Sequence, residues 1–101
     1  MREFVAGREM RFVRVHGEGN KARSWMMRAD EVEGLSAAQI RNKFALPDVP
    51  THISDVHVPA GTKIRAGKVA PQEGWGIGGA YQYELLQRLR ESAFRNTRPL
   101  Q

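Results

Sequence analysis

The chain has 101 residues, no cysteine and a formal net charge of +5 at pH 7. This length suits one domain with a single modest core, and the lack of cysteine excludes disulfides, thiolate zinc sites and a cysteine nucleophile. The excess of Lys and Arg favours an anionic partner such as a nucleotide, a nucleic acid or an acidic protein. Since no apolar run reaches the length of a membrane span, we expect no stable membrane association.

A strand is predicted at residues 11–16, where branched, aromatic and charged residues alternate. Side chains of a strand point alternately to its two faces. We therefore expect Val13 and Val15 to face the core, with Arg14 and His16 on the opposite face.

The next segments predict a turn at residues 17–20, where glycine is frequent, and a second strand at residues 24–28. A helix at residues 37–45 follows. Ser36 and Gln39 have the spacing of a capping box, in which the side chain of each residue bonds the backbone N–H of the other. Such a short helix is marginal alone, so it must dock on a sheet.

The second half predicts three more strands, at residues 53–58, 63–70 and 81–86, with Gly67 as a candidate bulge. The tail from residue 87 to 101 is compatible with either a helix or a hairpin return. The chain therefore predicts an α+β fold, in which one short helix docks on a small, strongly bent, mainly antiparallel sheet.

Residues 74–79 contain four glycines in six positions. Glycine contributes no side-chain packing and costs entropy to order, so we interpret this segment as a mobile loop in which Trp75 covers a ligand. The segment is not a dinucleotide fingerprint, because it lacks the flanking strand and helix, and it is not a P-loop. The alternative is a plain hairpin connection.

The predicted strand after this loop carries Gln82 and Glu84 on one face, because residues two apart point the same way. Together with Arg14 they can bind a ribose and a phosphate. The alternative is that they form the solvated face of an antiparallel sheet.

The three histidines, His16, His52 and His57, match no metal-ligand spacing, so we expect no bound metal. His16 or His57 can act as the acid or base of a metal-free ribonuclease. The alternative is a structural or exposed histidine.

Several phrases of the chain resemble the variable C-terminal toxin domains of filamentous-hemagglutinin-like contact-dependent growth inhibition proteins and related polymorphic toxins. These phrases are residues 29–36, 40–47, 53–56 and 58–62, and the resemblance covers residues 11–86. It implies that residues 1–101 form a single toxin domain, the C-terminal piece of a much larger secreted or surface protein. Such a domain acts in the cytoplasm of a neighbouring bacterium, and a dedicated immunity protein, expected here to be acidic, masks its site.

One activity implied by this resemblance is NAD consumption, as in necrotizing-toxin glycohydrolases and, more distantly, ADP-ribosyltransferases. Those domains carry an arginine on an early strand, an aromatic residue on a second strand and a Gly-Gly-Gly-x-Gln-Tyr segment. Here Val13-Arg14-Val15, Ser24-Trp25-Met26 and Gly78-Gly79-Ala80-Tyr81-Gln82-Tyr83 fall in that order, with Ala80 in place of the third glycine.

The resemblance implies that Arg14 holds the pyrophosphate, Trp25 shapes the nicotinamide pocket and Gln82 acts at the ribose. Gln82-x-Glu84 also resembles the transferase motif. NAD is then the substrate, and no cofactor is bound permanently. The implied catalytic residues are Gln82, Glu84 and Arg14, and the implied substrate-binding residues are Trp25, Ser24, Trp75, Gly78 and Gly79.

A second implied activity is a metal-free ribonuclease toxin that cleaves tRNA or rRNA. Its candidate residues are His16 or His57 for proton transfer, with Arg14, Lys63, Arg65 or Lys68 for the phosphate. A third interpretation, from a different class, is a non-enzymatic binding module whose glycine-rich loop contacts a protein.

Overall fold

The computed structural model describes residues 2–17 and 24–100, and over these residues the chain has an α+β fold. The α-helix of this part is α1 (Ala37–Phe44). Short 3₁₀ turns lie at Ala29–Glu31 and Glu91–Ala93. The strands are β1 (Arg2–Val5), β2 (Met10–His16), β3 (Trp25–Met26), β4 (His52–Val58), β5 (Lys63–Lys68), β6 (Tyr81–Leu85) and β7 (Phe94–Pro99).

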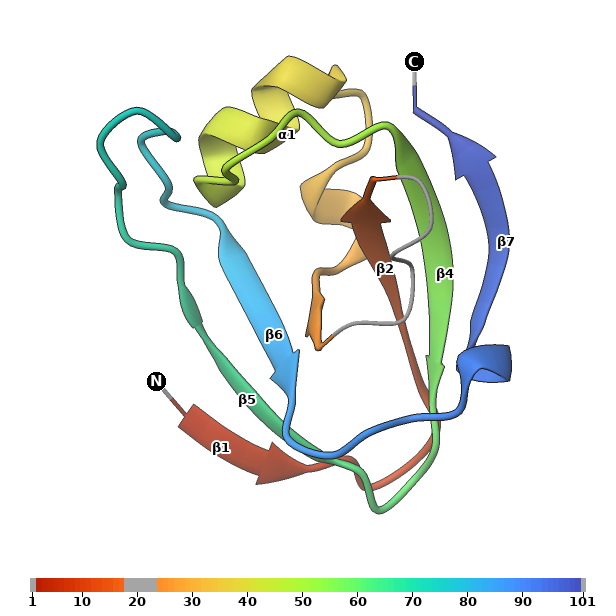
Figure 1. Cartoon of the computed structure of the whole chain (residues 1–101). Coiled ribbons are helices and arrows are strands. Elements are labelled where there is room, and N and C mark those ends of the chain that lie inside the picture. Colours follow the sequence, from red (N-terminus) through yellow and green to blue (C-terminus); the bar gives the residue numbers. More distant parts are fainter. Residues whose placement is uncertain (1, 18–23, 101) are drawn as a thin grey trace.

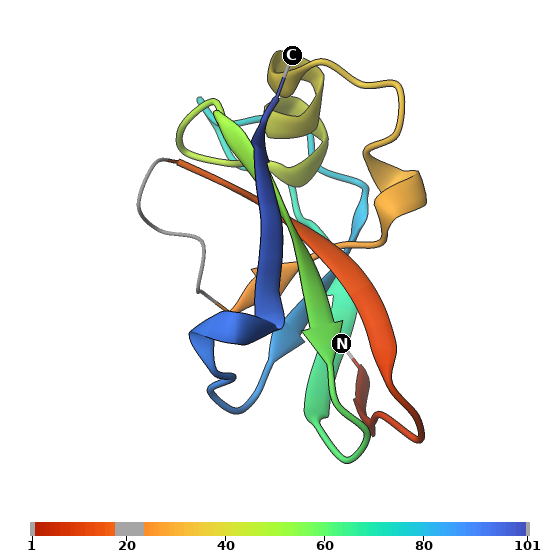
Figure 2. The same cartoon turned by 90° about the vertical axis from the view of Figure 1, so that its right-hand side faces the viewer.

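The strands form two antiparallel sheets, one in the order β1-β5-β6-β3 and the other in the order β2-β4-β7. Val13 of β2 and Met27, next to β3, exchange two backbone hydrogen bonds of 2.8 Å, which join the sheets. Figures 1 and 2 show the resulting curved layer, with β5 and β6 on one side, β4 and β7 on the other, and α1 across one end. The predicted fold class, a bent antiparallel layer with one docked helix, is confirmed.

The core consists of two clusters that meet at β2. One cluster takes side chains from both sheets, among them Phe12, Met26, Val56, Ile64, Leu85 and Phe94. The other includes the helix residues Ile40 and Phe44 together with Val13, Val15, Met27 and Ile53. Since Phe12 and Val13 belong to different clusters, β2 is buried on both faces. The face that carries Arg14 and His16 is therefore not solvated, and these side chains are only 9% and 6% exposed.

Helix α1 begins and ends at the signals expected from the sequence. The Ser36 hydroxyl accepts from the Gln39 N–H at 3.2 Å, and the Ser36 N–H donates to the Gln39 side chain at 2.8 Å. Ala45 ends the helix in the left-handed region, with φ of 49°. A complete capping box stabilises a helix by about 1 kcal/mol, and docking of Ile40 and Phe44 supplies the rest.

Other sequence expectations need correction. The strand expected at 24–28 is shortened to β3, because Met27 turns to pair with β2. Gly67 is not a bulge, since the β5–β6 register runs unbroken through it, and the irregularity lies instead between Ile53 and Asp55 of β4. The tail, for which the sequence was compatible with a helix or a hairpin return, forms strand β7. Strand β1 forms in a segment that has no clear sequence signal.

Most of the turn expected at residues 17–20 lies outside the described residues. Within the described part of the chain, no helix is long and apolar enough to cross a membrane.

Candidate functional site

A cleft of about 640 Å³ opens between β2, β3 and β6 on one side and the segments after α1 and β5 on the other. Segments 44–50 and 68–75 contribute to its lining. The polar and aromatic side chains around it include Arg14, His16, Trp25, Lys68, Trp75 and Gln82. The structure thus brings together residues that are up to 68 positions apart in the chain (from 14 to 82).

Arg14 belongs to β2 in the cleft wall, and a hydrogen bond to the neighbouring strand β3 holds its side chain. Its Nη1 donates to the backbone oxygen of Trp25 at 2.7 Å, which ties β2 to β3. The cleft therefore holds a nearly buried positive charge in a defined position.

Gln82 lies in the middle of β6, opposite Gly67 of β5, and is partly buried. Its side-chain amide makes no hydrogen bond to another residue within the described chain, although it lines the cleft. An amide offers an acceptor oxygen and two donor hydrogens. A strand thus presents to the cleft a polar group whose hydrogen-bonding capacity remains available for a ligand.

Glu84 shares the sheet face of Gln82, as the two-residue period predicts, but it is not among the cleft-lining residues. Both Nε and Nη2 of Arg65 donate to its Oε1, the first at 3.0 Å. The hydrogen bond to Glu84, and then the attraction of its charge, raise the pKa of Arg65 above its ordinary value. The structure pairs this carboxylate with Arg65 rather than with Arg14.

The residues of the ribonuclease interpretation fall into two groups. His16 lines the cleft together with Arg14 and Lys68, whereas His57 lies five residues along β4 from His52, the register partner of His16. Five residues of a strand span about 16 Å. The Nδ1 of His57 is 3.7 Å from the Glu9 carboxylate, and Lys63 and Arg65 belong to the other sheet. The structure does not bring the two histidines to one phosphate.

His16 is held by a chain of hydrogen bonds that the sequence did not reveal. Its Nδ1 lies 2.7 Å from the oxygen of Gly17, and its Nε2 lies 2.7 Å from the Ser54 hydroxyl. Because a carbonyl only accepts, Nδ1 carries the hydrogen, and when the ring is neutral Nε2 accepts from the Ser54 hydroxyl. Ser54 in turn lies 2.7 Å from the Thr97 hydroxyl. These residues come from three strands, and only the β2-β4-β7 order places them together.

The glycine-rich loop is fastened to the C-terminal end of α1. The Gly78 N–H donates to the Asn42 carbonyl at 3.0 Å, and the Ile77 N–H donates to the Asn42 side chain at 3.1 Å. A Cβ on Gly76 would lie 2.4 Å from the Asn42 oxygen, and one on Gly78 would lie 2.5 Å from the Val69 oxygen. Glycine is therefore needed at positions 76 and 78 for the close approach of two backbones. The mobility expected of this loop stays a prediction.

Gly78 and Gly79 lie outside the cleft lining and hold the loop through their backbone. The Gly79 N–H, for example, donates to the Val69 oxygen at 2.9 Å. The two glycines therefore support the loop through backbone hydrogen bonds and do not form part of the cleft surface.

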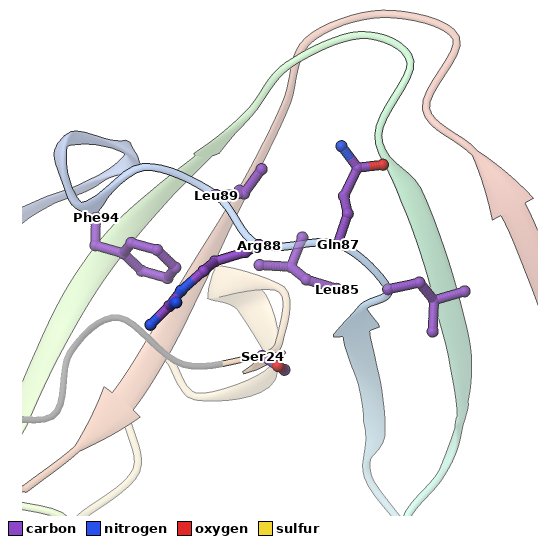
Figure 3. Close-up of a pocket in the computed structure, with 7 residues that line it drawn as sticks. Ser24, Leu85, Gln87, Arg88, Leu89 and Phe94 are labelled. Carbon is purple, nitrogen blue, oxygen red and sulfur yellow. The ribbon is translucent and has the colours of Figure 1, made fainter.

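Ser24 lines a separate hollow of about 340 Å³, next to the segment that links β6 to β7. Figure 3 shows Arg88 extending across this hollow beside Phe94, while Gln87 points the other way. The Gln87 side chain accepts from the Lys63 N–H at 3.1 Å. Ser24 thus lies beside the cleft residue Trp25 in sequence but faces a different depression.

Over residues 2–17 and 24–100, no group of three or more His, Asp or Glu side chains is arranged to hold a metal ion. No protein-family model matches the chain, and no curated protein or solved structure shows significant similarity to it. Functional inference therefore depends on the cleft itself and on the sequence phrases described above.

Proposed function

We propose that this chain is an interbacterial toxin domain that hydrolyses NAD at the bond between nicotinamide and ribose. The observation that carries the proposal is the convergence of Arg14, Trp25 and Gln82 in one cleft. They come from β2, β3 and β6, so the three parts of the resemblance to NAD-consuming toxins meet at one site.

The reaction needs one bond to break and one to form. The bond between ribose C1′ and the nicotinamide nitrogen breaks, and its electron pair neutralises the positively charged ring. The oxygen of a water molecule bonds to C1′ and releases one proton to solvent. The products are nicotinamide and ADP-ribose, and positive charge develops on the ribose in the transition state.

Each converging residue suits one part of this reaction. The Arg14 guanidinium matches the negative pyrophosphate, and its bond to the Trp25 carbonyl fixes its direction. Trp25, 39% exposed, offers an indole face for the nicotinamide ring. The Gln82 amide oxygen can stabilise the developing charge on the ribose or orient the attacking water.

The biological setting is part of the same proposal and rests on the toxin-like phrases. The domain would act in the cytoplasm of a target bacterium after delivery by a larger protein. The net charge of +5 suits an acidic immunity protein in the producing cell. A non-enzymatic binding module would instead leave cells that express the chain unharmed.

The proposal is tested by incubating purified chain with NAD and, in parallel, with total tRNA and rRNA. We expect release of nicotinamide and ADP-ribose, while the RNA remains intact. Gln82→Ala should lower kcat by about 100-fold, the effect of removing one group that stabilises transition-state charge. Gln87→Ala is the matched control and should retain full activity, because Gln87 lies outside the cleft. Discrete RNA fragments with undiminished NAD would establish the ribonuclease alternative instead.

A further inference from the structure

The part of the cleft that lies away from the strands has two rims, and Arg41 of α1 binds both. One rim is the segment 46–50 after α1, and the other is the segment 70–75 after β5. The Nη2 of Arg41 donates to the Pro47 oxygen at 3.2 Å and to the Gly74 oxygen at 2.9 Å. A single guanidinium nitrogen thus fixes the spacing of the two rims.

Trp75 stands on a tight turn within the second rim. Gln72 and Gly76 exchange backbone hydrogen bonds of 3.0 and 3.1 Å, and the Trp75 N–H donates to the Gln72 oxygen at 3.0 Å. The indole is nevertheless 44% exposed and lines the cleft. An aromatic ring on a fixed backbone loses little entropy when a planar ligand stacks on it.

The lining as a whole presents two indoles from separate elements. Trp25 belongs to β3, and Trp75 belongs to the loop that lies beside α1 in both views of the chain (Figures 1 and 2). Val49, 51% exposed, adds apolar surface on the first rim. Arg14 and Lys68 supply positive charge to the same lining. This combination suits a ligand that has two ring systems and a negatively charged linker.

We propose that the rims at 46–50 and 70–75 form a second ring-binding subsite, spaced by Arg41, that makes the cleft select dinucleotides over mononucleotides. Trp75 stacks on the second base, and Arg41 is a positioning residue that does not touch the ligand. The assignment of that base as the adenine of NAD rests on the proposed function. The subsite itself rests on the contacts of Arg41 and Trp75.

The first test compares NAD with nicotinamide mononucleotide, which lacks the second ring. Stacking of one base corresponds to about 30-fold in affinity. We expect kcat/KM to be about 30-fold higher for NAD. Trp75→Ala should raise KM for NAD by about 10-fold or more, with kcat and the mononucleotide values unchanged, and Trp75→Phe should restore part of the loss. Ile77→Ala is the control, because Ile77 is exposed on the same loop but outside this cleft.

Arg41→Gln tests the spacing of the rims. It should raise KM for NAD about as much as Trp75→Ala, again at constant kcat, because the stacking surface remains but its position is lost. Equal turnover of both substrates, or an unchanged KM in Trp75→Ala and Arg41→Gln, would overturn the subsite while leaving NAD hydrolysis in place.

A binding measurement separates the two proposals. ADP-ribose carries the second base and the pyrophosphate but no nicotinamide. In a Trp25→Phe background it should quench the fluorescence of Trp75 with saturation, and Arg41→Gln should weaken this binding by about 10-fold. If ADP-ribose binds in this way while NAD is not cleaved, the subsite stands and the proposed function fails. Absence of saturable quenching would overturn the subsite, whatever the activity.

Discussion

The cleft has a strand half, formed by β2, β3 and β6, and a loop half, formed by residues 44–50 and 68–75. Different contacts hold the two halves in place. In the strand half, Arg14 and His16 are nearly buried, and bonds to the Trp25 carbonyl and the Ser54 hydroxyl hold their side chains. In the loop half, Trp75 and Val49 are about half exposed, and only the backbone beneath them is fixed, through the end of α1. A charged group needs support at the side chain itself, because its direction decides which atoms it meets. An apolar ring needs only a fixed backbone.

The largest effect on kcat/KM is expected when the positive charge of the strand half is removed. Arg14→Met should lower kcat/KM for NAD by about 100-fold, because the pyrophosphate would lose a nearly buried charged partner. Steady-state kinetics of nicotinamide release would measure the change.

Arg14→Lys and Arg8→Met complete this experiment. The lysine variant keeps the charge but cannot both hold the Trp25 carbonyl and present a fork of donors, so it should recover only part of the activity. Arg8 is exposed and outside the cleft, so its loss should leave the kinetics unchanged. An Arg14→Met protein with full activity would show that the strand half does not hold the substrate.

The segment that supports the loop half from outside the cleft lining can be tested through Gly78 and Gly79. Gly78→Ala should lower the free energy of unfolding by about 3 kcal/mol, because φ is +67° and the new Cβ would meet the Val69 carbonyl at 2.5 Å. Gly79→Ala is the matched control, with φ of +95° but no atom within 4 Å of the new Cβ, and should cost about 1 kcal/mol. Urea denaturation of both variants gives the difference. Equal costs would mean that Gly78 does not pack against the Val69 carbonyl, one residue after β5.

A smaller effect is expected at the cap of the helix that carries the loop half. Ser36→Ala should lower the free energy of unfolding by about 1 kcal/mol, since the Gln39 N–H would lose its acceptor. Thermal and urea unfolding would measure it against Ser92→Ala, an exposed serine near β7 that should change stability by less than about 0.5 kcal/mol. The same stability in both variants would show that the Ser36 cap does not stabilise α1.

The smallest effect is expected outside both halves. Glu84→Gln should change kcat/KM for NAD by less than about threefold, because Glu84 is paired with Arg65 and does not line the cleft. A loss of more than about tenfold would place the carboxylate at the substrate, and the transferase-like motif would then describe the chemistry.

Local signals in the sequence were sufficient where a pattern involves neighbouring residues. The Ser36–Gln39 capping box and the alternation of Val13, Arg14 and Val15 are of this kind. Strand β7 was ambiguous, because its arginines indicate solvent exposure but not whether the chain is helical or extended. Its pairing with β4 is a tertiary contact that overrides weak local preference.

The site was predictable only in part, for the same reason. Arg14, Trp25, Trp75 and Gln82 were singled out from the sequence, and they line one cleft. Arg41 was not, because its bonds to Pro47 and Gly74 join segments with no shared sequence pattern. The close backbone contacts of Gly76 and Gly78 were not foreseen, since composition cannot distinguish a loop that needs freedom from one that needs close contact.

The pairing of β3 with β6 has a consequence for when the cleft first exists. It joins residues 25–26 to residues 83–84, and the two residue sets that line the cleft lie at 14–50 and 68–82. A chain emerging from the ribosome therefore cannot assemble the cleft until nearly all of the domain has been synthesised. Pairings between residues so distant in sequence also form slowly. Under the proposed function, the cell that makes this chain is exposed to no activity until synthesis of the domain is nearly complete.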